Sequence, residues 1–211
     1  LLERFEYVHE LCVAHSKRQN HVRFCRQAPL PAHAQSASVL SCGSLLDAGA
    51  KLLICSSPNL RVLDLSGMSH LTSATLVAAL SKCRALNTLL LRSCWRICEG
   101  WPSHMSVVDL GCSRCLPLRH LDLSHTNMSE SALRVLFQLA PNLTRLELNF
   151  CERIGDSSLA HLPEDLQRLG LLGCPRVSPE QLRRLEQCVE KLMCDDSFVT
   201  IRPTGNGAHA D

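Results

Sequence analysis

One stretch of the sequence decides the fold, and it reads Leu143-Thr-Arg-Leu146-Glu-Leu148-Asn-Phe-Cys151-Glu-Arg-Ile154-Gly-Asp156-Ser-Ser-Leu159-Ala-His-Leu162. Its skeleton is L-x-x-L-x-L-x-x-C-x-x-I, followed by a tail that we expect to be helical. Leu146 and Leu148 alternate with polar residues, which is the period of a strand with one buried face. Cys151 is small and weakly polar, which suits a tight buried turn after that strand. The stretch therefore predicts a strand, a turn and a helix.

The same skeleton recurs along the chain. Successive copies are separated by 26, 32, 25 and 23 residues, and they start at Leu60, Leu86, Leu118, Leu143 and Leu166. Leucines at helical spacing follow the strands, as at Leu133 and Leu136. One such unit cannot bury its apolar face alone, so neighbouring units must stack. We therefore predict an α/β solenoid of about six units, with parallel strands on a concave face and helices on a convex face.

Two degenerate units flank the five clear ones. One begins at Ala34 and carries Val39, Cys42 and Leu45 at matching offsets, and the other is 189–194. Degenerate ends are expected in a solenoid because its terminal core faces must be capped. We therefore place the solenoid at 34–194 and a polar C-terminal tail at 195–211. The glycine-containing composition of 202–211 is typical of disorder.

The first 33 residues allow several interpretations. Phe5, Val8, Leu11 and Cys12 fall at helical spacing, which predicts an amphipathic capping helix and linker over 1–33. A zinc site is the second interpretation, and its ligands would be Cys12, His15, His21 and Cys25. The third is a tail that belongs to another domain. The chain begins with Leu1 and not with Met, which suggests a fragment of a longer protein.

The motif C-x-x-I-x-D-x-x-L, present as Cys151, Ile154, Asp156 and Leu159, resembles the cysteine-containing leucine-rich repeat. That repeat occurs in the substrate-binding half of F-box ubiquitin-ligase receptors. The resemblance covers residues 34–194 and implies a module that recognises the substrate of a ubiquitin ligase. The same repeat also serves in flagellar, mitochondrial and plant-receptor assemblies, so the alternative is a scaffold subunit. The sequence before residue 34 shows no three-helix F-box module.

The outward residues of the predicted strands form columns on the concave face, which is the usual docking surface of a solenoid. A basic column lies beside an acidic one, and arginine is enriched at binding hot spots. The predicted partner-binding residues are Thr88, Leu90, Arg92, His120, Asp122, Arg145, Glu147, Asn149 and Arg168. The plainer alternative is that the opposite charges pair across neighbouring strands and keep the face soluble.

The unit that starts at Leu86 is about six residues too long, and both tryptophans of the chain, Trp95 and Trp101, lie in its extra material. Insertions in a solenoid map to loops on one face, often the binding face. The tryptophans are predicted either to anchor a partner or to fill a local gap over an exposed helix end.

One pattern suggests chemistry. Cys94-x3-Cys98-x13-Cys112-x2-Cys115 approximates a four-thiolate zinc site. However, Cys94 occupies the buried turn of its repeat, and a solenoid does not bring that turn to the far end of its own helix. The phosphate-cradling and nucleophile-elbow motifs are missing from the sequence. We therefore predict no enzyme activity, no metal and no cofactor.

Composition narrows the class of partner. A net charge of +2 argues against a nucleic-acid surface. The sequence has no run of 18 or more apolar residues, so no membrane-spanning helix is predicted. Thirteen cysteines is an odd number, and most have apolar neighbours, which indicates buried free thiols in a reducing compartment, with the cytoplasm as our assignment. Protein partners are expected, and a small-molecule substrate is not.

Overall fold

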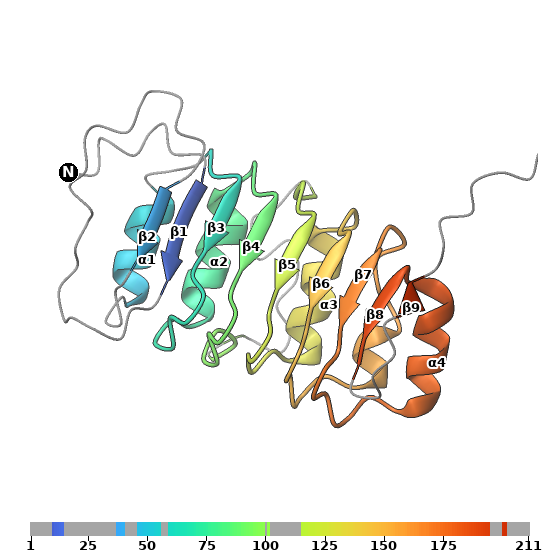
Figure 1. The fold of residues 1–211 in the computed structure, drawn as a ribbon. Coiled ribbons are helices and arrows are strands. Elements are labelled where there is room, and N and C mark those ends of the chain that lie inside the picture. The colour runs from blue at the N-terminus through green and yellow to red at the C-terminus, as the bar shows by residue number, and fades with distance from the viewer. Residues whose placement is uncertain are drawn as a thin grey trace, which may run out of the picture.

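The computed structural model describes residues 10–14, 37–40, 46–55, 59–99, 101, 115–194 and 200–201. Six three-residue parallel strands form the centre of one sheet, one strand for each predicted unit from Leu60 onward (Figure 1). They are β3 (Val62–Asp64), β4 (Thr88–Leu90), β5 (His120–Asp122), β6 (Arg145–Glu147), β7 (Arg168–Gly170) and β8 (Lys191–Met193). The predicted α/β solenoid of about six repeats is confirmed.

The register of these strands is the one that the repeat predicts. Arg145 pairs with His120 on one side and with Arg168 on the other, and Glu147 pairs with Asp122 and Gly170. The middle leucine of every strand is buried, and the first and third leucines of the skeleton belong to the same continuous core. Each fully buried leucine contributes about 1.5–3 kcal/mol, so the repeated leucines supply most of the driving force for folding.

Helices cover one side of the sheet and leave the other side open (Figure 1). They are α1 (Asp47–Cys55), α2 (Ser73–Lys82), α3 (Glu130–Leu139) and α4 (Pro179–Cys188). Three of them begin at a hydroxyl side chain, from Thr72, Ser129 and Ser178, that accepts a backbone N–H of the first turn. Within the described ranges, no helix has both the length and the apolar character needed to cross a membrane.

The repeat that starts at Leu143 lacks the expected α-helix. It has a four-residue 3-10 helix, η2 (Asp156–Leu159), where the next repeat has α4. Pro163 occupies the position that Glu186 holds inside α4. A proline there removes an intrahelical hydrogen bond and clashes with the carbonyl four residues earlier, so the longer helix cannot form.

The acidic residue at the start of a helix ties neighbouring repeats together. The Asp156 carboxylate accepts the backbone N–H of Ser178, the N-cap of α4, at 2.8 Å. Asp47 accepts the backbone N–H of Thr72, the N-cap of α2, at 2.9 Å, and also the hydroxyl protons of Thr72 and Thr75. The aspartate of the repeat motif therefore links one helix to the start of the next.

The turn cysteines use their thiols in the same way. The thiols of Cys94, Cys151 and Cys174 donate to the carbonyls of Leu65, Leu123 and Leu148, each in the preceding repeat, at 3.0–3.1 Å. Cys94 and Cys151 are fully buried, and burial raises the pKa of their thiols to about 12 and about 11. In the repeat where threonine replaces cysteine, the Thr126 hydroxyl donates to Leu123 of its own repeat.

The N-terminal end corrects one expectation. The predicted capping helix includes Leu11 and Cys12, but these residues lie in β1 (Glu10–Ala14), a strand. β1 is inserted between β2 (Ala37–Leu40) and β3 and is parallel to both. Strand pairing satisfies the backbone groups of β1 on both edges and thereby overrides the helical spacing. The predicted histidine and Cys25 zinc ligands lie outside the described residues, as does the rest of 1–33.

The predicted unit from Ala34 has its strand in β2 and its helix in α1, but β1 separates it from β3. At the other end, two residues of the predicted tail form β9 (Thr200–Ile201), which pairs antiparallel with β8. β9 covers the backbone groups that β8 leaves open at the edge of the sheet. The predicted disordered segment, 202–211, lies outside the described residues.

Candidate functional site

The open face of the sheet, which is the side away from the helices, carries the predicted binding residues. Its first column runs across adjacent strands, and its members are Val62, Thr88, His120, Arg145, Arg168 and Lys191. The second column is Asp64, Leu90, Asp122, Glu147, Gly170 and Met193. Thr88, Leu90, His120 and Asp122 are half-buried, whereas Arg92 and Arg168 are exposed. The register thus brings the predicted strand residues into the two rows that the repeat requires.

The acidic residues of this face are largely occupied. Asp64 and Asp122 each accept the backbone N–H two residues onward, from Ser66 and Ser124, at 2.9 Å. These bonds close the turn at the end of β3 and β5, which is a structural role for a short carboxylate. Arg145 and Glu147 form an expected pair of opposite charges, but within one strand and not across neighbouring strands, since the Arg145 Nε atom donates to Glu147 at 3.0 Å.

Glu147 is the centre of a buried polar network. Glu147 is only 8% exposed, and its carboxylate also accepts a hydrogen bond from the Asn149 Nδ2 atom at 3.1 Å. Asn149 in turn accepts the backbone N–H of Leu172 through Oδ1 at 2.9 Å. The network lies over Gly170, where an added Cβ would overlap the Glu147 carboxylate and the Asn149 amide. Gly170 therefore makes room for the network. In β3 and β5 the aspartate of this column accepts the backbone N–H two residues onward, and for Gly170 the Asn149 side chain accepts the corresponding N–H, from Leu172.

The surroundings of His120 favour the uncharged form of its imidazole. Burial lowers the pKa of its imidazole, and the positive charge of Arg145 on the adjacent strand lowers it further, against the opposing effect of Asp122 and Glu147. The basic character of the first column therefore begins at Arg145 and not at His120.

One member of this column, Lys191, was not predicted from the sequence. Lys191 pairs with Arg168 across β7 and β8, so Arg145, Arg168 and Lys191 occupy three adjacent strands, about 4.8 Å apart. We call these three residues the basic strip. The signal is present in the sequence, since Lys191 stands two residues after Val189, but the repeat that starts there is degenerate. Among the described residues, no carboxylate forms an ion pair with Arg168 or Lys191.

The two tryptophans have different environments. Trp95 is 56% exposed, and the Arg96 guanidinium lies 5.8 Å from its ring centroid. Trp101 packs against the core, and within the described part of the chain its buried Nε1 atom has no hydrogen-bond partner. The packing of Trp101 supports the gap-filling alternative for that residue. Trp95 stays a predicted anchor.

The zinc pattern does not gather in the part of the chain that is described. The Cys94 thiol bonds to Leu65, the Cys98 thiol is buried 3.1 Å from the Met128 sulfur, and Cys115 is exposed. Cys112 lies outside the described residues. The described residues hold no cluster of three or more metal-ligating side chains.

Comparison with known proteins places the repeat among known folds. A family model described as "Leucine Rich repeat" matches residues 140–162. A chain in the crystal structure of the yeast Rad7 and Elc1 complex matches 76% of this chain at 25% identity, with a TM-score of 0.60. This chain spans 40% of that chain.

Two further solved structures match this chain at lower similarity. The leucine-rich repeat-containing protein LegL7 from Legionella pneumophila is 20% identical over 71% of this chain and 52% of its own, with a TM-score of 0.44. An internalin from Listeria monocytogenes is 12% identical over 78% of this chain and 49% of its own, with a TM-score of 0.43.

Proposed function

Because this chain folds as a leucine-rich-repeat solenoid, we propose that it is a protein-recognition module whose open face holds an acidic segment of a protein partner. The basic strip carries the proposal. Arg168 is exposed and Lys191 half-buried, and neither forms an ion pair among the described residues, so both charges are available to a ligand. In protein–protein interfaces, complementary charges increase specificity and speed up association.

The surroundings of the basic strip support an extended ligand. Met193, the second-column neighbour of Gly170, and Leu172, two residues after Gly170, are half-buried. An acidic side chain on the strip and an apolar side chain over Leu172 and Met193 would both find a matching surface. Leu90, in the second column of β4, continues the same face toward the N-terminal repeats, and the exposed Arg92 follows it two residues later.

In its narrower form, the proposal is that the module recognises the substrate of a ubiquitin ligase. Two observations support it. The turn cysteines bond to the preceding repeat as a cysteine-containing repeat would need, and the yeast relative with a TM-score of 0.60 was crystallised in a protein complex. Cys94, Cys98 and Cys151 are buried free thiols, which supports a reducing compartment.

The test is a comparison of partners in native cells. The full-length protein is purified by an affinity tag, as wild type and as the variant Arg168→Glu with Lys191→Glu, and the partners are quantified by mass spectrometry. The matched control is Arg183→Glu with Arg184→Glu, which makes the same charge change at exposed positions of α4. Arg145 is left intact because its loss would disturb Glu147.

Three outcomes decide the matter. Loss of one set of partners from the strip variant alone, with ligase subunits retained by all three proteins, supports the receptor. Loss of partners without any ligase subunit supports recognition by the open face and rejects the ubiquitin role. A fixed set of subunits that neither variant disturbs, or only the α4 variant does, indicates a scaffold and rejects the open-face site.

A further inference from the structure

The turn after each of strands β3 to β7 contains one residue with left-handed backbone conformation. It stands seven residues after the first leucine of these five repeats, and φ is between 56° and 79° at Gly67, Ser93, His125, Phe150 and Gly173. Glycine adopts this conformation without cost, whereas other residues are strained by about 1–3 kcal/mol. A bulky aromatic residue there needs a reason beyond folding.

Phe150 is that residue. Its φ is 59° and it is 47% exposed, so neither backbone preference nor burial explains its presence. Its ring stacks on His125, with ring centroids 4.4 Å apart, and on the other side it covers Gly173, where an added Cβ would overlap the ring. The neighbours hold the ring in one orientation while much of it stays open to solvent. Rigid exposed aromatics are typical binding anchors.

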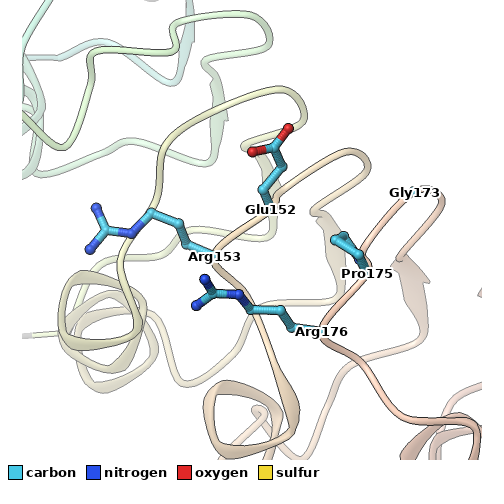
Figure 2. Close-up of a pocket in the computed structure, with 5 residues that line it drawn as sticks. All are labelled: Glu152, Arg153, Gly173, Pro175 and Arg176. Carbon is cyan, nitrogen blue, oxygen red and sulfur yellow. The ribbon is translucent and has the colours of Figure 1, made fainter.

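A shallow recess of about 470 Å³ lies next to Gly173, the residue that the Phe150 ring covers, and is lined by Glu152, Arg153, Gly173, Pro175 and Arg176. Figure 2 shows the side chains of Arg153 and Arg176 extending in the same direction from neighbouring turns, while Glu152 points away from them. Arg176 lies one repeat after Arg153, and its backbone pairs with Gly155.

The two guanidinium groups have few partners of their own. Arg153 donates to the Asn127 side chain at a long 3.4 Å, and among the described residues neither arginine forms an ion pair. Two adjacent positive charges repel each other unless an anion lies between them. Arginine pairs are well suited to carboxylates because the planar guanidinium can donate two parallel hydrogen bonds.

We propose that this recess is a second docking site, which takes an acidic, extended segment of a partner protein. A carboxylate of the segment binds between Arg153 and Arg176, and a neighbouring apolar side chain packs on the Phe150 ring over Gly173. Glu152 at the margin disfavours a dense polyanion, so a peptide with isolated acidic residues fits better than a nucleic acid. The site uses the turns after the strands and does not depend on the basic strip.

The test uses a phage-displayed peptide library, selected against the immobilised full chain. We expect wild type to enrich peptides in which Asp or Glu lies beside an apolar residue. Selected peptides are then synthesised with a fluorescent label and measured by fluorescence anisotropy. Arg153→Glu with Arg176→Glu should weaken their binding at least tenfold and should instead select Lys- or Arg-containing peptides. Arg183→Glu with Arg184→Glu should bind the acidic peptides as wild type does.

Phe150→Gly separates binding from folding. Glycine relieves the left-handed strain, so the free energy of unfolding should stay within error or rise, while affinity for the selected peptides falls by about tenfold. The strip variant, Arg168→Glu with Lys191→Glu, should keep these peptides, which makes this site distinguishable from the open face.

Several results would overturn the proposal. One is that selection yields no acidic peptides, and another is that the Arg153 and Arg176 variant binds them as tightly as wild type. A third is that Phe150→Gly unfolds the protein, which would assign the ring a structural role. A fourth is that a labelled 20-nucleotide oligo-dT binds more tightly than the peptides and loses binding in the same variant, which would assign the recess to nucleic acid.

Discussion

Strands β3 to β5 and strands β6 to β8 share their length and register, but they present different surfaces. In β3 to β5 the third residue is half-buried, and Asp64 and Asp122 turn back onto their own backbone. In β6 and β7 the third residue is buried, because Glu147 joins a side-chain network that fills the space over Gly170. The basic strip begins at Arg145, whose side chain donates to Glu147 of this network.

The difference shows how one repeat produces two surfaces. The leucines and turn cysteines specify the same backbone in both halves, so the outward residues are free to vary. A single glycine in the second column allows Glu147 and Asn149 to bridge two repeats and holds Arg145 beside them. The N-terminal half therefore offers a weakly charged surface, and the C-terminal half a positively charged one.

The largest expected effect comes from filling the space over Gly170. Gly170→Val should lower the free energy of unfolding by about 2–4 kcal/mol, since the new side chain displaces the Glu147 and Asn149 network and forces the buried carboxylate to move. Urea unfolding followed by circular dichroism measures the change. The matched variant Leu90→Val, in the same column of β4, should cost less than 1.5 kcal/mol. Equal losses at both positions would contradict the role of Gly170.

Removing the two kinds of carboxylate sharpens the comparison. Glu147→Ala should cost about 2 kcal/mol, because the Asn149 amide and Arg145 lose a charged partner, whereas Asp122→Ala should cost about 1 kcal/mol for one backbone bond. The same unfolding measurement applies to both. A larger loss of stability in Asp122→Ala than in Glu147→Ala would contradict the assignment of the main polar network to the C-terminal half.

The turn thiols should behave alike in both halves, which checks that the halves differ only on their open surface. Cys94→Ala and Cys151→Ala should each cost about 1–2 kcal/mol at neutral pH through a lost hydrogen bond and a small cavity. Cys188→Ala, at an exposed position of α4, should leave stability unchanged.

These thiols also predict alkaline instability. Burial raises the pKa of Cys94 from 9.0 to about 12 and that of Cys151 to about 11. Above pH 9 the unfolded chain loses these protons while the folded chain keeps them, so stability falls with pH by about 1.4 kcal/mol per unit and per thiol until the folded pKa is reached. Urea titrations at pH 8, 9.5 and 10.5 should show a shallower decline in either alanine variant. An unchanged decline would mean that these thiols already ionise in the folded protein.

The smallest effect is expected where the halves meet. Because burial and Arg145 lower the pKa of His120, Arg145→Gln should raise that pKa, though burial should keep it below the ordinary value. NMR titration of the imidazole measures the shift, and Arg168→Gln, one strand further away, should change it less. In wild type the unfolded histidine binds a proton that the folded one does not, so stability should decrease as the pH falls through the ordinary histidine pKa of about 6.5. A shift of the same size in both variants would mean that no specific Arg145 contact exists.

The sequence by itself determined the repeat, the six strands from Leu60 onward, their register and the rows of outward residues. It could do so because the spacing of leucines fixes which residues are buried, and stacking of identical units then fixes the pairing. Seven of the nine residues predicted on the open face lie in these paired strands, and their places follow from that register. Lys191 was missed only because its repeat is degenerate.

Tertiary structure decided what depends on contacts between repeats. The insertion of β1 beside β3, the fit of Glu147 and Asn149 over Gly170, and the stacking of Phe150 on His125 each join residues about 20–50 positions apart. Pro163 shows the intermediate case, since its effect on η2 is local but is recognised only when the repeats are aligned. The periodicity of the sequence specifies which side chains are buried. The residue that each side chain contacts depends instead on the side chains at the equivalent position of the neighbouring repeat.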